Sequence, residues 1–138
     1  MVIMSRSKAK SFGLLPRPEL VSFANVAGPD PSLLTQPSRA IMRAIDKAGV
    51  EPADVSLFEI NEAFAAVVAA SMADLGVDHA NVNVNGGAIA LGHPIGMSGA
   101  RLLMTLAAEL QRRGGGLGAA ALCGGGGQGI AALVRVGA

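Results

Sequence analysis

Aromatic residues are almost absent from this sequence of 138 residues. It contains no tryptophan and no tyrosine, and its four phenylalanines make up 3% of the residues. Apolar residues still account for 51%, and 19 residues are glycine. The core therefore has to be built from Ala, Val, Leu and Ile, which allow helices to pack closely on a sheet. A chain of this length is expected to form one domain, over residues 1–138.

Charge of either sign is also scarce. Charged residues make up 15% of the sequence and the formal net charge is +1. Nucleic acids and anionic membranes are bound through clustered Lys and Arg, and this sequence has neither a basic run nor a group of aromatic residues for base stacking. We therefore expect neither a nucleic acid nor a membrane as a partner.

Long hydrophobic runs are missing as well. Gly, Pro or a charged residue interrupts every apolar stretch before it reaches the roughly 18 residues of a membrane-spanning helix. Residues 1–12 also lack the apolar region of a signal peptide. A cytoplasmic location is the resulting expectation.

Cysteine and histidine are limited to one and two residues. A single cysteine excludes an intramolecular disulfide, so Cys123 is a buried apolar residue, a reactive thiol, or both. His79, His93 and Cys123 are separated by 14 and 30 residues, which matches no metal-ligand pattern, and we expect no metal site. His79 lies in a polar connection and is expected at the surface.

The succession of predicted elements indicates an α/β fold. Strands are predicted at 20–26, 55–60, 81–85, 117–122 and 130–136, the apolar run 2–4 indicates a strand end, and Pro16 and Pro18 predict a turn. Helices are predicted from Ser5 to Lys10, from Pro37 to Ala48, from an N-cap at Asn61 to Leu75, and from Ser98 to Arg113. We expect a mixed five-stranded sheet with helices on both faces, its last two strands antiparallel.

The last of these helices has an unusual composition. Residues 97–108 are apolar or small on every side except at Arg101. A helix with this pattern is normally covered all round, whereas one sheet covers a single face. The pattern therefore indicates a further layer that this chain does not supply.

Three polar segments, 61–64, 92–94 and 123–129, lie where a predicted strand meets a loop or helix. Taken singly, Asn61 is explained as a helix cap, His93 as a turn residue and Cys123 as a structural thiol. The glycine run 124–129 fits the G-x-G-x-x-G pattern, but no helix and no acidic residue follow it to complete a dinucleotide site. Consecutive glycines instead let backbone N–H groups approach one substrate oxygen, as an oxyanion hole requires.

Taken together, the three segments resemble the C-terminal half of the thiolase family. The matching stretches are Asn61-Glu62-Ala63-Phe64-Ala65, residues 83–96 with Gly92-His93-Pro94, and Cys123-Gly124-Gly125-Gly126-Gly127-Gln128-Gly129. Residues 2–14 also look like the opening of that half, so the likeness covers almost the whole chain. The resemblance implies two α/β halves stacked in five layers, with the active site between them and the nucleophilic cysteine on the first half, which this sequence lacks.

The resemblance also implies roles for particular residues. Cys123 matches the cysteine that acts as base on the Cα of acetyl-CoA and as acid in the reverse direction. His93 matches the histidine that activates the nucleophile and binds the thioester oxygen. Asn61 matches the asparagine that holds a water in the same oxyanion hole, and the backbone N–H of Gly125 contributes to a second one.

Substrate-contacting positions follow from the same resemblance. Ala63 and Phe64 match residues that line the pantetheine channel. Met97 stands where a smaller residue is common, and Gly124 replaces a bulkier apolar residue, so both bear on acyl specificity. The resemblance implies acyl-CoA and CoA as substrates, no bound cofactor, a thiolase N-terminal half as partner, and a homo-oligomer.

The hypothesis is therefore a catalytic C-terminal half that makes or cleaves 3-ketoacyl-CoA thioesters and is inactive without the first half. Two alternatives stay open. One is a non-catalytic binding or assembly module whose site residues are relics. The other is a thioesterase in which Cys123 is the nucleophile, with His93 and Asn61 as partners.

Overall fold

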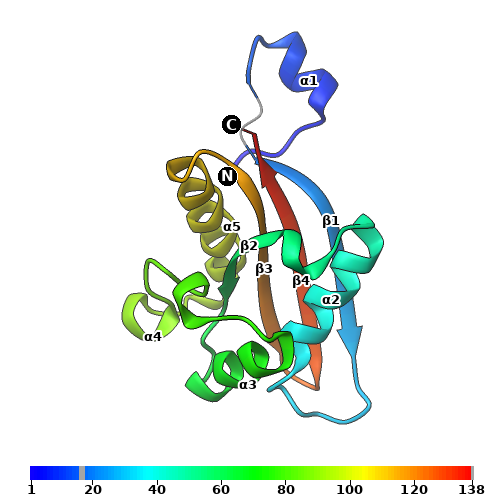
Figure 1. Ribbon diagram of the computed structural model, residues 1–138, viewed down its shortest axis with the longest axis vertical. Helices are drawn as coiled ribbons and strands as arrows, with labels where there is room; N and C mark the ends of the chain where they lie inside the picture. Colours follow the sequence, from blue (N-terminus) through cyan, green and yellow to red (C-terminus); the bar gives the residue numbers. More distant parts are fainter. Residues whose placement is uncertain (16–17, 138) are drawn as a thin grey trace.

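A four-stranded mixed sheet forms the centre of the molecule, in a computed structural model that describes residues 1–15 and 18–137 (Figure 1). Its strands are β1 (Pro18–Ala27), β2 (Val55–Ile60), β3 (Gly116–Gly124) and β4 (Gln128–Val136). They lie in the order β1-β4-β3-β2. Strand β4 is antiparallel to both β1 and β3, whereas β2 is parallel to β3. The antiparallel pairing expected for the last two strands is confirmed.

Helices cover both faces of the sheet, as expected (Figure 1). On one face α2 (Gln36–Ala48) packs against β1, β4 and β3, next to α3 (Ala65–Leu75). On the other face α5 (Ile95–Arg112) packs mainly against β3 and β2. The remaining helical segments are short: α1 (Arg6–Ser11), η1 (Pro52–Asp54), η2 (His79–Asn81) and α4 (Ala88–Leu91). Figure 1 shows α1 standing apart from the sheet.

The core consists of two apolar clusters, one on each side of the sheet. Ile41 and Ile45 of α2 join the cluster beneath that helix, and Leu102 and Leu106 of α5 join the other. The middle of β3 contributes only alanine and glycine, so no large side chain projects from this part of the sheet. A Cβ on Gly118 would overlap the Leu106 side chain, so the absence of a side chain there lets α5 lie close to the sheet. This arrangement fits the scarcity of aromatic residues.

Local sequence signals located the helices with one clear error. Helix α2 ends at Ala48, as predicted, and Gly49 after it adopts the left-handed conformation at φ 64° that commonly ends helices. Helix α5 begins at Ile95, three residues before the expected start. The N-cap prediction for Asn61 was wrong, because α3 begins at Ala65 and Phe64 precedes it as the capping residue. Asn61 instead continues the sheet, its backbone N–H donating to the Ala121 carbonyl oxygen at 2.9 Å.

The prediction of a fifth strand, over residues 81–85, was also wrong. Residues 81–85 form only an isolated bridge, between Phe58 and Val82. Asn83 has a positive φ of 49°, and its side-chain amide pairs with the Ile60 backbone, accepting from the N–H and donating to the carbonyl oxygen, each at 2.9 Å. This side chain thus makes the hydrogen bonds that a neighbouring strand would make. Residues 2–4 are exposed and outside any strand. Of the predicted turn, Pro16 lies outside the described residues, and Pro18 is the first residue of β1.

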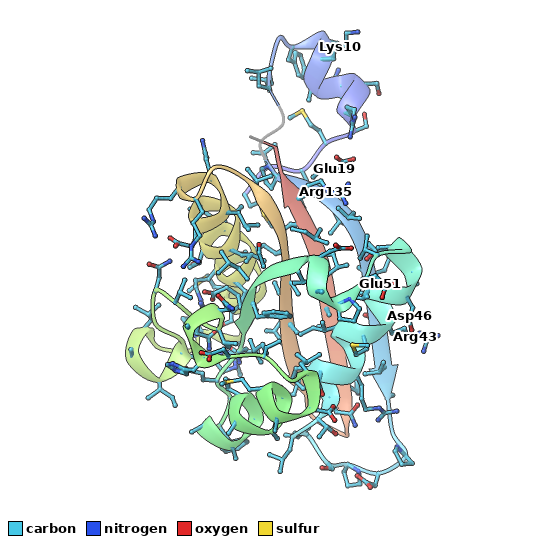
Figure 2. All side chains as sticks on the ribbon, viewed as in Figure 1. Lys10, Glu19, Arg43, Asp46, Glu51 and Arg135 are labelled. Atoms are coloured by element: carbon cyan, nitrogen blue, oxygen red, sulfur yellow. The ribbon has the colours of Figure 1, made fainter. Side chains whose placement is uncertain are left out.

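Charged side chains lie mostly on the outside of the molecule (Figure 2). Glu19 of β1 is opposite Arg135 of β4, and Arg43 and Asp46 lie on the exposed side of α2 (Figure 2). Within residues 1–15 and 18–137, no helix combines the length and apolar character needed to cross a membrane. His79 is exposed in η2, as predicted.

Candidate active site

The candidate site begins at the end of β2, where Asn61 is buried. Asn61 is 1% exposed. Because it follows Glu59 by two residues, the side chains of Asn61 and Glu59 both lie on the α5 face of the strand. The Asn61 side-chain nitrogen Nδ2 lies 3.3 Å from His93 Nε2. The structure therefore brings together two of the four catalytic residues predicted from the sequence, although they are 32 positions apart.

His93 is held by the start of α5. Its Nδ1 lies 2.6 Å from Ser98 Oγ, and the same hydroxyl donates to the Pro94 carbonyl oxygen at 3.1 Å. We assign the hydroxyl proton to that second bond, so that Ser98 Oγ accepts from the imidazole and the imidazole proton lies on Nδ1. Nε2 then carries a lone pair and accepts from Asn61 Nδ2. A neutral imidazole in this tautomer can take a proton at Nε2, which is the task of a general base.

Glu62 fixes the loop that carries His93. Its carboxylate accepts from the Ile89 backbone N–H at 2.8 Å and from Asn83 Nδ2 at 3.3 Å. A Cβ at Gly87 would overlap this carboxylate, so glycine is required where the loop passes over Glu62. In the sequence, Glu62 stands out only as a member of the matching stretch Asn61-Glu62-Ala63-Phe64-Ala65. Its contacts to the distant loop had no signal in local sequence.

Cys123 lies near the end of β3, the neighbour of β2 in the sheet. It is two residues past Ala121, whose carbonyl oxygen accepts the Asn61 N–H. Among the described residues, Cys123 makes no side-chain hydrogen bond to His93 or Asn61. The thiol is partly buried, and this burial raises its pKa. A cysteine that acts as a nucleophile needs the opposite shift, from a nearby cation or helix N-terminus.

The glycine loop after Cys123 contains glycines with different requirements. Gly127 has a φ of +74°, and a Cβ there would overlap the Asp30 carbonyl oxygen; a Cβ at Gly129 would overlap that of Gln36. These two glycines let the loop pack against residues 28–36, where Gly28 N–H also donates to the Gly127 carbonyl oxygen. Gly125 differs, because it is exposed, lacks a positive φ and would have no atom within 4 Å of a Cβ. Among residues 1–15 and 18–137, no neighbouring atom requires glycine at position 125.

The predicted substrate-contacting residues lie at the surface around this region. Phe64 is 62% exposed and Met97 is 45% exposed, whereas Ala63 is half-buried. Phe64 precedes α3 and Met97 lies in the first turn of α5. Two large apolar side chains that face solvent here are available to an apolar ligand or another protein surface.

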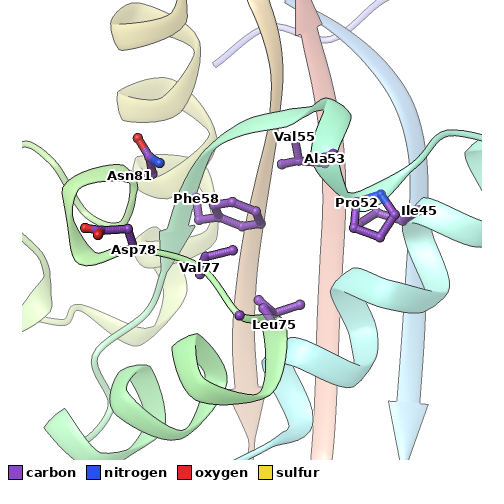
Figure 3. A pocket seen from close by; sticks show the side chains of 10 residues that line it. Ile45, Pro52, Ala53, Val55, Phe58, Leu75, Val77, Asp78 and Asn81 are labelled. Atoms are coloured by element: carbon purple, nitrogen blue, oxygen red, sulfur yellow. The ribbon is translucent and has the colours of Figure 1, made fainter.

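Of two surface hollows lined by the described residues, one includes Cys123 and Gly124 and the other includes no predicted site residue. The larger, of about 470 Å³, is lined by residues at the ends of β1, β3 and β4 and by Arg43: Asn25, Val26, Ala27, Arg43, Cys123, Gly124, Gln128, Gly129 and Ile130. Asn61 and His93 do not line it. The other, of about 300 Å³, lies among α2, η1, β2 and η2 (Figure 3). Its walls are mostly apolar. We place the candidate chemistry at the Cys123 hollow and at the Asn61–His93 pair, which begins at the end of the neighbouring strand β2.

Sequence reasoning missed a buried ion pair beside Asn61. Arg101 of α5 donates from Nη1 to Glu59 Oε2 at 2.7 Å, and their side chains are 13% and 3% exposed. Burial raises the pKa of Glu59 to about 7, against the opposing effect of Arg101. In the described part of the chain, two buried side-chain polar atoms have no hydrogen-bond partner, Asn61 Oδ1 and Arg101 Nη2. The only sequence signal was Arg101 itself, the one charge within an apolar helix segment.

A metal centre finds no support in the arrangement of the candidate ligands. Across residues 1–15 and 18–137, no three His, Cys, Asp or Glu side chains gather as a metal site would require. Asn61, His93 and Ser98 bond to one another, and His93 would have to leave Ser98 or Asn61 to bind a metal.

Comparison with known families gives an extended match. Residues 14–136 match the family described as "Thiolase, C-terminal domain". A probable acetyl-CoA acetyltransferase of Mycolicibacterium smegmatis is 53% identical over 135 residues, which are 98% of this chain and 35% of that protein. A cytosolic acetyl-CoA acetyltransferase of Rattus norvegicus is 51% identical over 138 residues, covering 99% of this chain and 34% of the rat protein.

The fold is likewise similar to that of a solved structure. The crystal structure of the Bacillus anthracis acetyl-CoA acetyltransferase matches with a TM-score of 0.91 and 42% identity. That match covers 96% of this chain and 34% of the chain compared with it. The present chain thus spans about a third of the length of the proteins it matches.

Proposed function

Because the chain belongs to the thiolase C-terminal domain family, we propose that it is the catalytic C-terminal half of an acyltransferase that acts on acyl-CoA thioesters. The observation that carries the proposal is the Asn61–His93–Ser98 hydrogen-bond chain beside the strand that bears Cys123. In the proposed reaction, an acyl group moves between CoA and a carbon nucleophile, by condensation of acetyl-CoA or cleavage of a 3-ketoacyl-CoA.

His93 is proposed to work on the acylation step. Its Nε2 lone pair takes the proton of a cysteine on the partner half, and the resulting thiolate attacks the thioester carbonyl. The protonated imidazole then donates to the developing oxyanion, together with a water on Asn61. The acyl–cysteine bond forms as the bond to the CoA sulfur breaks, and the departing CoA thiolate takes the proton back from the imidazole. Ser98 keeps the proton on Nδ1, so that Nε2 carries the lone pair, which takes the thiol proton in place of its hydrogen bond from Asn61 Nδ2.

Cys123 is proposed to work on the carbon acid. As a thiolate it removes a proton from the Cα of the second acetyl-CoA and becomes a thiol. The carbanion attacks the acyl group on the partner's cysteine, the acyl–sulfur bond breaks, and that cysteine leaves as a thiolate. A thiol whose pKa is raised by burial gives a stronger base once ionised, which suits removal of a weakly acidic C–H proton. The open space at Gly125 supports a role for its backbone N–H toward the substrate oxygen, since a Cβ there would approach the ligand.

A first thiolase half is the proposed partner, and the outward face of α5 is its proposed contact. This face consists of residues on the side of α5 away from the sheet: Met97, Ala100, Met104 and Ala108. All four are apolar and all are exposed or half-buried, with Met104 56% exposed. A surface helix normally turns charged or polar residues outward. Gly99, which has no atom within 4 Å of a built Cβ, would further allow a helix of the partner to approach closely.

The remaining parts of the proposal concern assembly and location. We expect the complete enzyme to be a homo-oligomer and, in line with the name of the cytosolic rat relative, to act in the cytoplasm. No bound cofactor is part of the proposed chemistry. Met97 and Gly124 are proposed to influence which acyl chains fit.

The thioesterase alternative is less well supported by the geometry. It requires Cys123 to be activated by His93, but His93 bonds to Asn61 and Ser98, and the pKa of Cys123 is raised. Mass spectrometry after incubation with acetyl-CoA separates the two functions. An acetyl adduct on Cys123 would favour the thioesterase. The relic alternative predicts no activity under any condition.

The proposal is tested by combining the chain with a thiolase first half and following thiolysis of acetoacetyl-CoA. The chain alone should show no turnover, and the complex should show CoA-dependent cleavage. His93→Ala should lower acylation of the partner's cysteine by a factor of about 10² or more, since it removes a base and an oxyanion donor. His79→Ala, at the exposed second histidine, is the matched control and should leave the rate unchanged. Equal rates for both variants would remove His93 from the mechanism.

The role of Cys123 needs a separate readout. Cys123→Ala in the same complex should abolish condensation of acetyl-CoA while the partner's cysteine still becomes acylated. Condensation at near the parent rate would show that another group is the base.

A further inference from the structure

The two buried atoms without hydrogen-bond partners are complementary and lie in the same interface. Asn61 Oδ1 can only accept a hydrogen bond and Arg101 Nη2 can only donate one. Glu59 and Asn61 alternate on the α5 face of β2, and Ser98 and Arg101 are neighbours one turn apart on α5. The pair Glu59–Arg101 and the chain Asn61–His93–Ser98 are thus two adjacent polar links between β2 and α5.

Leaving both atoms unpaired would be costly, because a buried polar group without a partner loses its hydration. The two atoms do not hydrogen-bond to each other. Both are inaccessible in this chain, so a protein docked on its surface cannot supply their hydrogen bonds without rearrangement. Buried waters commonly satisfy polar groups in such positions.

We infer that one internal water molecule bridges Arg101 Nη2 and Asn61 Oδ1, and that Arg101 through it acts as a positioning residue for Asn61 and His93. This inference rests on the proposed function for its catalytic meaning, but not for its geometry. An asparagine amide can be turned by half a rotation, which exchanges its oxygen and nitrogen. A donor on the Arg101 side holds the oxygen there and leaves Nδ2 facing His93. His93 then keeps its lone pair on Nε2, the atom proposed to receive the thiol proton.

The planar guanidinium is what makes this possible. One nitrogen, Nη1, is already bonded to Glu59, and the other, Nη2, points its donors elsewhere in a fixed geometry. A lysine at this position would keep the charge and the pair with Glu59, but it has no second nitrogen in a fixed place. Arg101→Lys therefore separates positioning of Asn61 from the ion pair that links β2 to α5.

The tautomer of His93 is the quantity to measure, by long-range ¹H–¹⁵N correlation of the imidazole rings. The 138-residue chain has two histidines, so His79 serves as an internal reference. At a pH of about 9, where a histidine of ordinary pKa is neutral, we expect His93 to carry its proton on Nδ1. Arg101→Lys should raise the ratio of the Nε2–H to the Nδ1–H form at least about fivefold, the effect of losing a typical hydrogen bond.

The matched control is Arg112→Lys on the same helix. Arg112 binds the buried carboxylate of Glu109 through Nε and Nη2 at 2.9 and 2.7 Å, but it lies away from Asn61. This variant should leave both histidine spectra unchanged. An Nε2–H tautomer in the unaltered chain would overturn the inference, as would an unchanged tautomer ratio in a folded Arg101→Lys.

If Arg101→Lys does not fold, water cross-relaxation in the unaltered chain decides. A cross-peak between a long-lived water and the Asn61 side-chain amide protons is expected, and its absence would overturn the inference. Neither measurement needs turnover. A chain that shows the expected tautomer but never transfers an acyl group with a first half would contradict the proposed function and leave the positioning role intact.

Discussion

Replacing three glycines of one loop by alanine should give three different outcomes, although the chemical change is identical. At Gly127 the alanine has to adopt a positive φ, which costs about 1–2 kcal/mol. Its Cβ also overlaps the Asp30 carbonyl oxygen, and relieving such an overlap costs about 1–3 kcal/mol more. We expect Gly127→Ala to lower the free energy of unfolding by about 2–5 kcal/mol.

Gly129 and Gly125 separate the two contributions. Gly129→Ala meets only the Gln36 carbonyl oxygen and has no positive φ, so its expected cost is about 1–3 kcal/mol. The Cβ of Gly125→Ala would have no neighbouring atom within 4 Å. Because alanine restricts the unfolded chain more than glycine does, this variant should be as stable as the parent or more stable by about 0.4–1 kcal/mol.

Urea titrations of the three variants, fitted with a common m-value, measure these differences in the free energy of unfolding. A Gly127→Ala variant as stable as the parent would refute the close approach of the loop to residues 28–36. The second readout is acyl transfer with a thiolase first half. There Gly125→Ala should lose most condensation activity despite its stability, because its Cβ would occupy space next to the proposed oxyanion position. A fully active Gly125→Ala would refute that placement.

Three further predictions concern stability and association. Because the pKa of Glu59 is raised to about 7, its contribution to stability is complete below pH about 4.5 and is lost as the pH rises through 7. Urea titrations of Glu59→Gln should lack this loss, which is on the order of 3 kcal/mol. Leu133→Ala, at a fully buried position in the larger core cluster, should cost about 2–5 kcal/mol in the same titrations. The chain should self-associate at micromolar concentration. Met104→Gln, on the exposed face of α5, should weaken this self-association in sedimentation experiments. Equal self-association of the parent chain and Met104→Gln would place the contact elsewhere.

Features encoded within a few residues were predictable from the sequence. Helix α2 lies within one residue of its predicted range 37–48, and the local signals for its ends are Pro37 in its first turn and Gly49 after its last residue. The N-cap of α1 behaves in the same way, since Ser5 Oγ accepts from the Lys8 N–H at 3.2 Å. Such signals depend only on backbone conformation near the residue that carries them.

Features that depend on distant partners were not predictable in this way. Asn61 has the residue type of a helix cap, but its backbone N–H donates to the carbonyl oxygen of Ala121 in the sheet, 60 positions later. Asn83 lies in an alternating Asn–Val stretch typical of a strand, but its side chain bonds to Ile60. In both cases a tertiary hydrogen bond outweighs a local preference.

The candidate site shows the same division. The resemblance of whole segments named Asn61 and His93, and the structure places them in hydrogen-bond contact. The contacts of Glu62 with the loop and of Arg101 with Glu59 join elements 27 and 42 positions apart. Nothing in the surrounding sequence distinguishes them from ordinary surface charges until the fold brings the partners together.

The position of β4 inside the sheet has a consequence for the order of folding. This strand, made from residues 128–136, pairs with β1 on one side and β3 on the other. Strand β1 has no other partner in the sheet, and about 110 residues separate the paired segments, so closing them carries a large entropic cost. During synthesis β1 must remain an unpaired strand edge until residues 128–136 leave the ribosome. A ribosome stalled before that point would hold β2 and β3 without the strand that joins them to β1, and β1 would be available for pairing with other chains.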